Sequence, residues 1–197
     1  MGQVLTPAFR TYQETVVANA QALAKGLVDL GYKVVTGGTD NHIVLVDMTS
    51  KKLSGSKADL ILEEVSISVN KNTVPGDKSA MNPSGIRFGT PPLTTRGIKP
   101  EHMPSIVGFI DRALNLAVEI QAVSGPKLVD YKKVLHENSE FGAKIDALRQ
   151  QVEDFAKQFP LPGREDLWWT IFIQCFLDTK HGRAHFIAPN CAISIIS

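Results

Sequence analysis

Arg87 is the residue whose surroundings most clearly point to chemistry. It stands alone in the apolar stretch 86–88, with Gly85 and Gly89 on either side. A guanidinium presents a planar fork of N–H donors that matches a carboxylate with paired hydrogen bonds. Glycines on both sides let a ligand or another backbone segment come close. These residues alone predict either an anion-binding site or an internal salt bridge, because structural ion-pair networks also use arginine.

Asn72 is the second polar residue of interest, and it ends the run Asn70-Lys71-Asn72 ahead of Pro75-Gly76. Its amide offers both a hydrogen-bond donor and an acceptor, which suits the polar edge of a ligand. The same residue type is also common in turns, and the following Pro-Gly pair allows that interpretation. Lys71 between the two asparagines is expected to be solvated.

Ordered sequence matches around these residues resemble serine hydroxymethyltransferase. The matching segments are Thr36–His42, Asn70–Asn72, and Ser84–Arg87 followed by Gly89-Thr90-Pro91. Several long matches in order are far more specific than one short motif. The resemblance extends over roughly residues 5–163 and is to the C-terminal portion of that family, so we expect the cofactor-binding half to lie upstream of Met1.

The resemblance implies the activity of a glycine hydroxymethyltransferase. That reaction converts serine and tetrahydrofolate to glycine and 5,10-methylenetetrahydrofolate with the cofactor pyridoxal phosphate. By resemblance, Arg87 binds the carboxylate of the substrate and Asn72 contacts folate. The Thr-rich run ending in His-Lys that carries the family's Schiff-base lysine does not occur in this sequence. We therefore expect no catalytic residue in this chain and no activity from the chain alone.

The resemblance also implies a homo-oligomer for the full-length enzyme. An alternative is that this chain is a non-catalytic, truncated module that associates with full-length subunits. In that case the helix expected over residues 6–30 would expose an apolar face that belongs against the missing half.

Helical spacing of apolar residues predicts three long helices. The first follows the N-cap Thr6 and Pro7 and ends at Gly31, and the others cover about 103–121 and 139–159. A shorter helix is expected to begin at Ser56. Strands are expected over 32–36, 42–48 and 86–88, with the first two antiparallel, and an extended segment over 67–72.

These elements predict an α/β fold in which a small antiparallel sheet packs with helices. The resemblance makes this fold the C-terminal small domain of a fold-type I pyridoxal-phosphate enzyme. We expect residues 1–30 to form a long helix linking from the missing cofactor domain and residues 31–163 to form the C-terminal α/β domain.

Composition excludes several other classes of protein. The 197 residues are enough for one ordinary domain, and the formal net charge of +1 argues against a nucleic-acid or membrane-surface partner. Two cysteines give no disulfide framework, and no secretory signal is present. We expect a cytoplasmic protein, with a mitochondrial or plastidic parent left open.

Residues 164–197 form an atypical tail, which we hypothesise is not native family sequence but intron read-through or a frameshift. Its apolar run at 167–177 contains both tryptophans and is shorter than the roughly 20 residues that a membrane helix needs. Cys175, His181, His185 and Cys191 hint at zinc, but structural zinc sites bring two cysteines close together at one end. No metal site is predicted.

Overall fold

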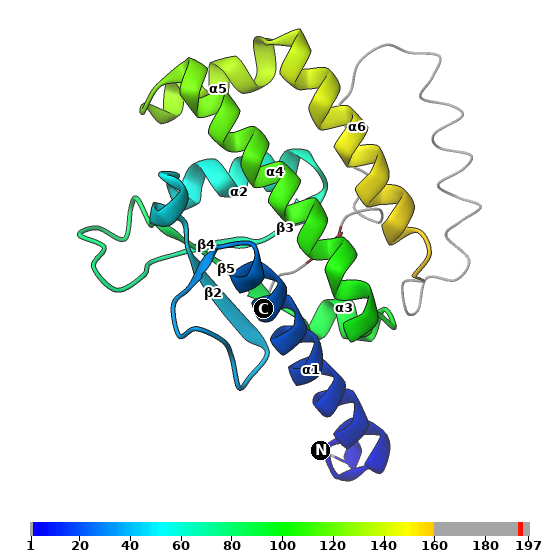
Figure 1. Ribbon diagram of the computed structural model, residues 1–197. Coiled ribbons are helices and arrows are strands. Elements are labelled where there is room, and N and C mark those ends of the chain that lie inside the picture. Colours follow the sequence, from blue (N-terminus) through cyan, green and yellow to red (C-terminus); the bar gives the residue numbers. More distant parts are fainter. Residues whose placement is uncertain (1, 160–192, 195–197) are drawn as a thin grey trace.

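A four-stranded antiparallel sheet with the strand order β1-β2-β5-β4 forms the frame of the fold. The computed structural model describes residues 2–159 and 193–194 (Figure 1). The sheet consists of β1 (Lys33–Val34), β2 (Ile43–Asp47), β4 (Asn70–Asn72) and β5 (Gly85–Gly89). A second, two-stranded sheet pairs β3 (Ile67–Ser68) with β6 (Ile193–Ser194) in parallel.

The described part of the chain contains six α-helices, and those that contact the sheet lie on one of its faces. They are α1 (Pro7–Asp29), α2 (Gly55–Glu64), α3 (Pro91–Thr95), α4 (Met103–Ser124), α5 (Leu128–Glu137) and α6 (Ser139–Ala156), with short 3₁₀ turns η1 (Gly2–Leu5), η2 (Met48–Lys51) and η3 (Pro100–His102). Helix α1 packs on β1 and β2, α2 packs on β4 and β5, and α4 contacts both helices (Figure 1). Helices α5 and α6 pack in turn on α4. The expected α/β fold with a small antiparallel sheet is confirmed.

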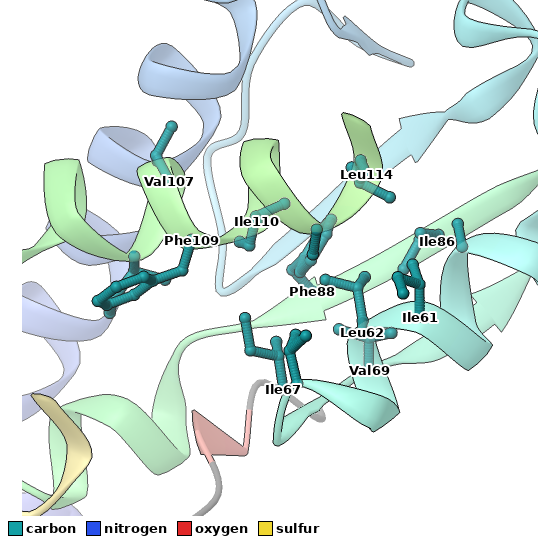
Figure 2. Close-up of a cluster of buried hydrophobic side chains, with 14 of the residues drawn as sticks. Ile61, Leu62, Ile67, Val69, Ile86, Phe88, Val107, Phe109, Ile110 and Leu114 are labelled. Atoms are coloured by element: carbon teal, nitrogen blue, oxygen red, sulfur yellow. The ribbon is translucent and has the colours of Figure 1, made fainter. Parts of the chain in front are cut away.

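Side-chain alternation along the strands explains why the helices contact one face of the sheet. Val44 and Val46 of β2 lie opposite Phe88 and Ile86 of β5, and all four are at most 1% exposed. Figure 2 shows Ile86 and Phe88 among side chains from α2 and α4, including Ile110. This cluster is the hydrophobic core. The residues between these positions, Arg87 among them, must therefore point to the opposite face.

The helix ends agree with the sequence at α1 and differ at α2. Thr6 caps α1 as expected, and its Oγ1 accepts a hydrogen bond from the Phe9 amide at 3.2 Å. The expectation that Ser56 caps the next helix is wrong. Ser54 is the N-cap, since its Oγ accepts from the Lys57 amide at 3.3 Å, and Ser56 is buried in the first turn. Ser54 and Ser56 flank the first helical residue, Gly55. Only Ser54 lies outside the helix and three residues before an amide of the first turn, that of Lys57, from which its side chain accepts a hydrogen bond.

The apolar face of α1 is mostly covered within this chain. Its buried side chains, Val16, Ala20, Leu23, Ala24 and Leu27, belong to the core against the sheet and α4. The truncated-module alternative expected this helix to expose an apolar face that belongs against the missing half, but most of that face packs within this domain. The large apolar side chains that are exposed here lie before the helix and at its end, where Leu5 is 89% and Leu30 is 44% exposed.

Asn19 joins α1 to the segment after the sheet through a buried polar contact. Its side chain is fully buried, and Nδ2 donates to Thr94 Oγ1 at 2.9 Å and to the Ile98 carbonyl at 2.8 Å. A buried acceptor left without its donor costs much more than an exposed one. This amide therefore fixes α1 against α3.

Replacing Asn19 with alanine is expected to lower the free energy of unfolding by about 2 kcal/mol, because two buried acceptors lose their donor. Urea denaturation of the chain measures this change. Asn115→Ala is the matched control, since Asn115 is exposed on α4 and bonds only Asp111 within the described residues. We expect its change to stay within about 0.5 kcal/mol. Equal losses in the two variants would contradict the role of Asn19.

Several predictions for the tail fall outside the described residues. These are the apolar run at 167–177 and the cysteines and histidines considered for zinc. Ile193 is described: it is fully buried in the core, and its amide donates to the Ser66 carbonyl at 2.8 Å. None of the helices in the described ranges is long and apolar enough to cross a membrane.

Candidate functional site

Arg87 lies in the middle of β5 on the face away from the helices. The registers place it opposite Leu45 of β2 and opposite Asn70 of β4. All three residues are half-buried, whereas the neighbours of Arg87 in β5 are buried. The backbone of Arg87 is therefore held by β2 on one side and by β4 on the other.

The guanidinium of Arg87 has spare donors. No carboxylate among the described residues lies within 4.0 Å of it, and its Nε is buried without a hydrogen-bond partner. In the amide orientation that satisfies both of its own groups, Asn70 accepts from Arg87 Nη2 at 3.2 Å and donates to the Val69 carbonyl at 3.1 Å. The internal salt bridge that the sequence left open is not found in the described part of the chain. The buried Nε–H and the terminal N–H groups belong to one charged guanidinium, and an anion can accept hydrogen bonds from both.

Asn72 lies close to Arg87 on the same face. It is the last residue of β4 and pairs with Gly85, so it is the diagonal neighbour of Arg87 across the two strands. Such neighbours stand about 7–8 Å apart. Its Nδ2 donates to the Thr73 carbonyl at 2.7 Å, and no other described residue bonds its amide. The structure thus brings the two residues predicted from the sequence onto one surface.

Gly85 makes this close arrangement of β4 and β5 possible. A Cβ built on Gly85 would lie 2.4 Å from Val74 Cγ1, 2.9 Å from the Asn72 carbonyl oxygen and 3.1 Å from the Val46 carbonyl oxygen. Glycines beside Arg87 were predicted to allow the close approach of a ligand or of another backbone segment. The structure shows that the approaching atoms belong to this chain's own segments.

Asp47 forms an ion pair on the same face of the sheet at the end of β2. Its Oδ2 accepts from Lys33 Nζ at 2.8 Å, and its Oδ1 accepts from the Thr49 amide at 2.9 Å and from Thr49 Oγ1 at 2.6 Å. Burial alone would raise the pKa of Asp47, but the hydrogen bonds from Lys33 and Thr49 outweigh burial and hold the pKa below its usual 3.8. Among the described residues, Lys33 is therefore engaged in a structural pair, unlike Arg87 on the same face.

This pair predicts a loss of stability in acid. Because the folded-state pKa of Asp47 is lowered, its contribution is fully present above pH 3.8 and is lost as the pH falls through the lower folded-state pKa. We expect Asp47→Asn to be less stable than the native chain at neutral pH, with the difference shrinking below pH 3.8. Urea denaturation as a function of pH measures this. A difference that is constant across the pH range would contradict the assignment.

Two further basic residues, His42 and Arg96, lie beside β2 and α3. The His42 side chain is exposed, while its carbonyl accepts from the Thr90 amide at 3.2 Å. Arg96 is buried, and its Nη2 donates to the carbonyls of Ala156 at 2.6 Å and Phe159 at 2.9 Å, at the end of α6. Arg96 therefore fixes the segment after α3 to the end of α6.

Two residues of this surface were missed from the sequence. Asn70 could have been found by strand alternation, because it shares a face with Asn72 two residues later. Asp77 had a weaker signal, as the last residue of the turn 74–77. Its Oδ2 accepts from the amides of Val74 and Ser84, each at 2.9 Å.

The described residues offer little to a metal or to an aldehyde cofactor. No group of three His, Cys, Asp or Glu side chains that could hold a metal occurs in the described ranges. The most buried lysine is Lys57, which is 2% exposed on α2 and donates to Gln121 Oε1 at 2.8 Å and to the Gly125 carbonyl at 3.0 Å. Burial lowers the pKa of Lys57. It is held at the end of α4, so the residues described around Arg87 do not by themselves fit pyridoxal phosphate.

Comparisons with known proteins relate most of this chain to one family. The model of the family described as serine hydroxymethyltransferase matches residues 1–110. A serine hydroxymethyltransferase of Bombyx mori is 53% identical over 163 residues, which cover 83% of this chain and 35% of the relative. The cytosolic enzyme of Oryctolagus cuniculus is 50% identical, with 82% and 34% covered. A chloroplastic enzyme of Arabidopsis thaliana is 44% identical, with 80% and 30% covered. The chain spans about a third of the length of these relatives.

Proposed function

The chain belongs to the serine hydroxymethyltransferase family, and from this we propose that it forms one wall of an active site that interconverts serine and glycine. In that site the hydroxymethyl carbon of serine passes to tetrahydrofolate, giving glycine and 5,10-methylenetetrahydrofolate. The wall is the face of the sheet that carries Arg87 and Asn72.

The single observation that supports this proposal most is the incompletely satisfied guanidinium of Arg87. Within the described part of the chain its Nε is buried without a partner, and no carboxylate neutralises it. The α-carboxylate of serine or glycine is a planar anion that matches the fork with two parallel hydrogen bonds. Holding the carboxylate in this way fixes the orientation of the whole amino acid.

Asn72 supplies the folate contact in this proposal. Its amide Nδ2 is engaged with the Thr73 carbonyl, which fixes the amide plane and leaves Oδ1 as an acceptor. An acceptor at the end of an edge strand suits an N–H group on the edge of a pterin ring. The diagonal spacing between Asn72 and Arg87 supports a folate that lies beside the amino acid.

The proposed role requires residues from other parts of the family's length. Pyridoxal phosphate, when bound, supplies an electron sink for the substrate amino acid. Its Schiff-base lysine would come from the two thirds of the relatives that this chain does not match. We propose that the described fold is the C-terminal small domain of a fold-type I enzyme, and that the complete enzyme is a homo-oligomer. This chain orients the substrate carboxylate and the folate.

A chimeric enzyme tests this function. The segment of this chain that matches the Bombyx mori relative replaces the corresponding third of that protein. We expect the chimera to form glycine from serine when tetrahydrofolate is present. A chimera that folds and binds pyridoxal phosphate as the parent does, yet forms no glycine, would contradict the proposal.

The second candidate is a non-catalytic module that associates with full-length subunits. The exposed apolar side chains at the beginning of the chain, Val4 at 61% and Leu5 at 89%, favour a contact there. Size-exclusion chromatography of the chain with the intact Bombyx mori enzyme separates the candidates. Co-elution without any chimeric activity would support the module, and an active chimera would support the enzyme.

A further inference from the structure

We propose that Asp77 is a positioning residue that holds Asn72 in place for folate while leaving the carboxylate site at Arg87 independent of it. This inference rests on the proposed function, because it assigns folate to Asn72. It concerns the connection between β4 and β5, which projects beyond the sheet in Figure 1.

One carboxylate oxygen of Asp77 joins the two ends of that connection. Oδ2 accepts from the Val74 amide at 2.9 Å and from the Ser84 amide at 2.9 Å. The Asp77 amide donates back to the Val74 carbonyl at 3.1 Å, and Gly76 at φ +101° supplies the left-handed conformation of this turn. Residues 78–82 between the two ends are exposed. Asp77 thus separates a projecting loop from the strands.

The two ends that Asp77 joins are not equally fixed. At the β5 end, the Ser84 carbonyl accepts from the Met48 amide at 3.0 Å, and the Pro83 carbonyl accepts from the Gly55 amide at 2.9 Å. At the β4 end, Val74 follows two residues after Asn72 and is 7% exposed. The carboxylate therefore anchors the end of β4 to a segment that the body of the domain already holds.

Asn72 depends on this anchor more than Arg87 does. Among the described strands, β4 is at the edge of the sheet and pairs only with β5, and Asn72 is its last residue. Arg87 lies in the middle of β5 between two paired strands. Ends of edge strands open more easily than the middle of a central strand. Removing the anchor should therefore disorder the folate contact and spare the carboxylate contact.

The carboxylate of Asp77 is ionised in this arrangement. Hydrogen bonds from Ser84 and Val74 hold the pKa of Asp77 below its usual value. An asparagine keeps one side-chain oxygen that can accept both amides, whereas an alanine keeps none. Comparing Asp77→Asn with Asp77→Ala therefore shows whether the hydrogen-bond acceptor is needed, since only the asparagine retains one.

Nuclear magnetic resonance of the chimeric enzyme, which supplies the rest of the site, tests the inference with two ligands. Tetrahydrofolate is titrated while the side-chain amide of Asn72 is observed, and glycine is titrated while Nε–Hε of Arg87 is observed. We expect Asp77→Ala to weaken tetrahydrofolate binding about tenfold, because the competent conformation becomes a minor state. Glycine binding should be unchanged. Asp77→Asn should bind both ligands as the unsubstituted chimera does, and so should the control Lys78→Ala in the exposed loop.

The outcomes separate this inference from the proposed function. Native affinity for tetrahydrofolate in Asp77→Ala, or an equal loss for both ligands, would overturn the positioning role. If the unsubstituted chimera shows no response of Asn72 to tetrahydrofolate, the folate assignment fails and the inference fails with it. Should Asp77→Ala not fold, Asp77→Glu displaces the carboxylate by one methylene and is expected to weaken tetrahydrofolate selectively. Unchanged tetrahydrofolate binding in that variant would overturn the role equally.

Discussion

Arg87→Lys is expected to raise the KM for serine in the chimeric enzyme roughly 10- to 100-fold, which corresponds to a loss of about 1.5–3 kcal/mol. A lysine keeps the charge but offers one compact head group in place of the fork. It also lacks a donor at the position of Nε, the buried group that has no partner in the described part of the chain. The substitution therefore removes the geometry of the contact and not its charge.

The matched control for this prediction is Arg112→Lys. Arg112 is exposed on α4, with its guanidinium carbon 5.1 Å from the centre of the Phe109 ring and Nη1 donating to Gln151. We expect the KM for serine to stay unchanged in this variant. A native KM in Arg87→Lys would show that the carboxylate is bound elsewhere.

Gly55→Ala is expected to destabilise the chain by about 3 kcal/mol or more, a large effect for one methyl group. A Cβ at this position would lie 2.4 Å from the Gly85 carbonyl oxygen and 2.8 Å from the Pro83 carbonyl oxygen. Both atoms belong to the backbone, so no side-chain rotation can relieve the clash. The beginning of α2 would have to move away from the entry to β5.

Gly142→Ala is the control for this prediction. Gly142 lies in α6 with no atom within 4 Å of a Cβ built there. Alanine should stabilise that helix by about 0.5–1 kcal/mol. Urea denaturation of both variants measures the contrast. A stability of Gly55→Ala within about 0.5 kcal/mol of the native chain would contradict the packing described for α2 and β5.

The sequence predicted the long helices and most strands because their periodic patterns are local. Thr6 with Pro7 and Gly31 marked the ends of α1, and a β-branched, apolar run marked β2, with a shorter apolar stretch at β5. Helix α5 was missed, since its ten residues contribute only Tyr131 and Leu135 to the core. Two buried positions give too weak a period to recognise.

The candidate site was predicted in part. Arg87 and Asn72 were found from residue type and resemblance, but their placement on one face follows from the register of β4 against β5. That register depends on Gly85 and on Val74 packing over it, which are contacts between distant segments. Asp77 was missed for the same reason, because its second partner, Ser84, follows only after an exposed loop.

The role of the 1–30 helix as a link to a cofactor domain and the origin of the 164–197 tail stay predictions. Helix α1 contributes to the core described above, so it also serves this domain. Cytosolic, mitochondrial and chloroplastic relatives all match this chain, and a cytoplasmic location likewise stays a prediction.

The most direct test of the central claim follows the Nε–Hε resonance of Arg87 in the chimeric enzyme during titration with glycine, and separately with glycinamide, which lacks the carboxylate. If Arg87 binds the substrate carboxylate, glycine shifts this resonance in a saturable manner and glycinamide leaves it in place. The same response to both compounds, or to neither, would contradict the claim.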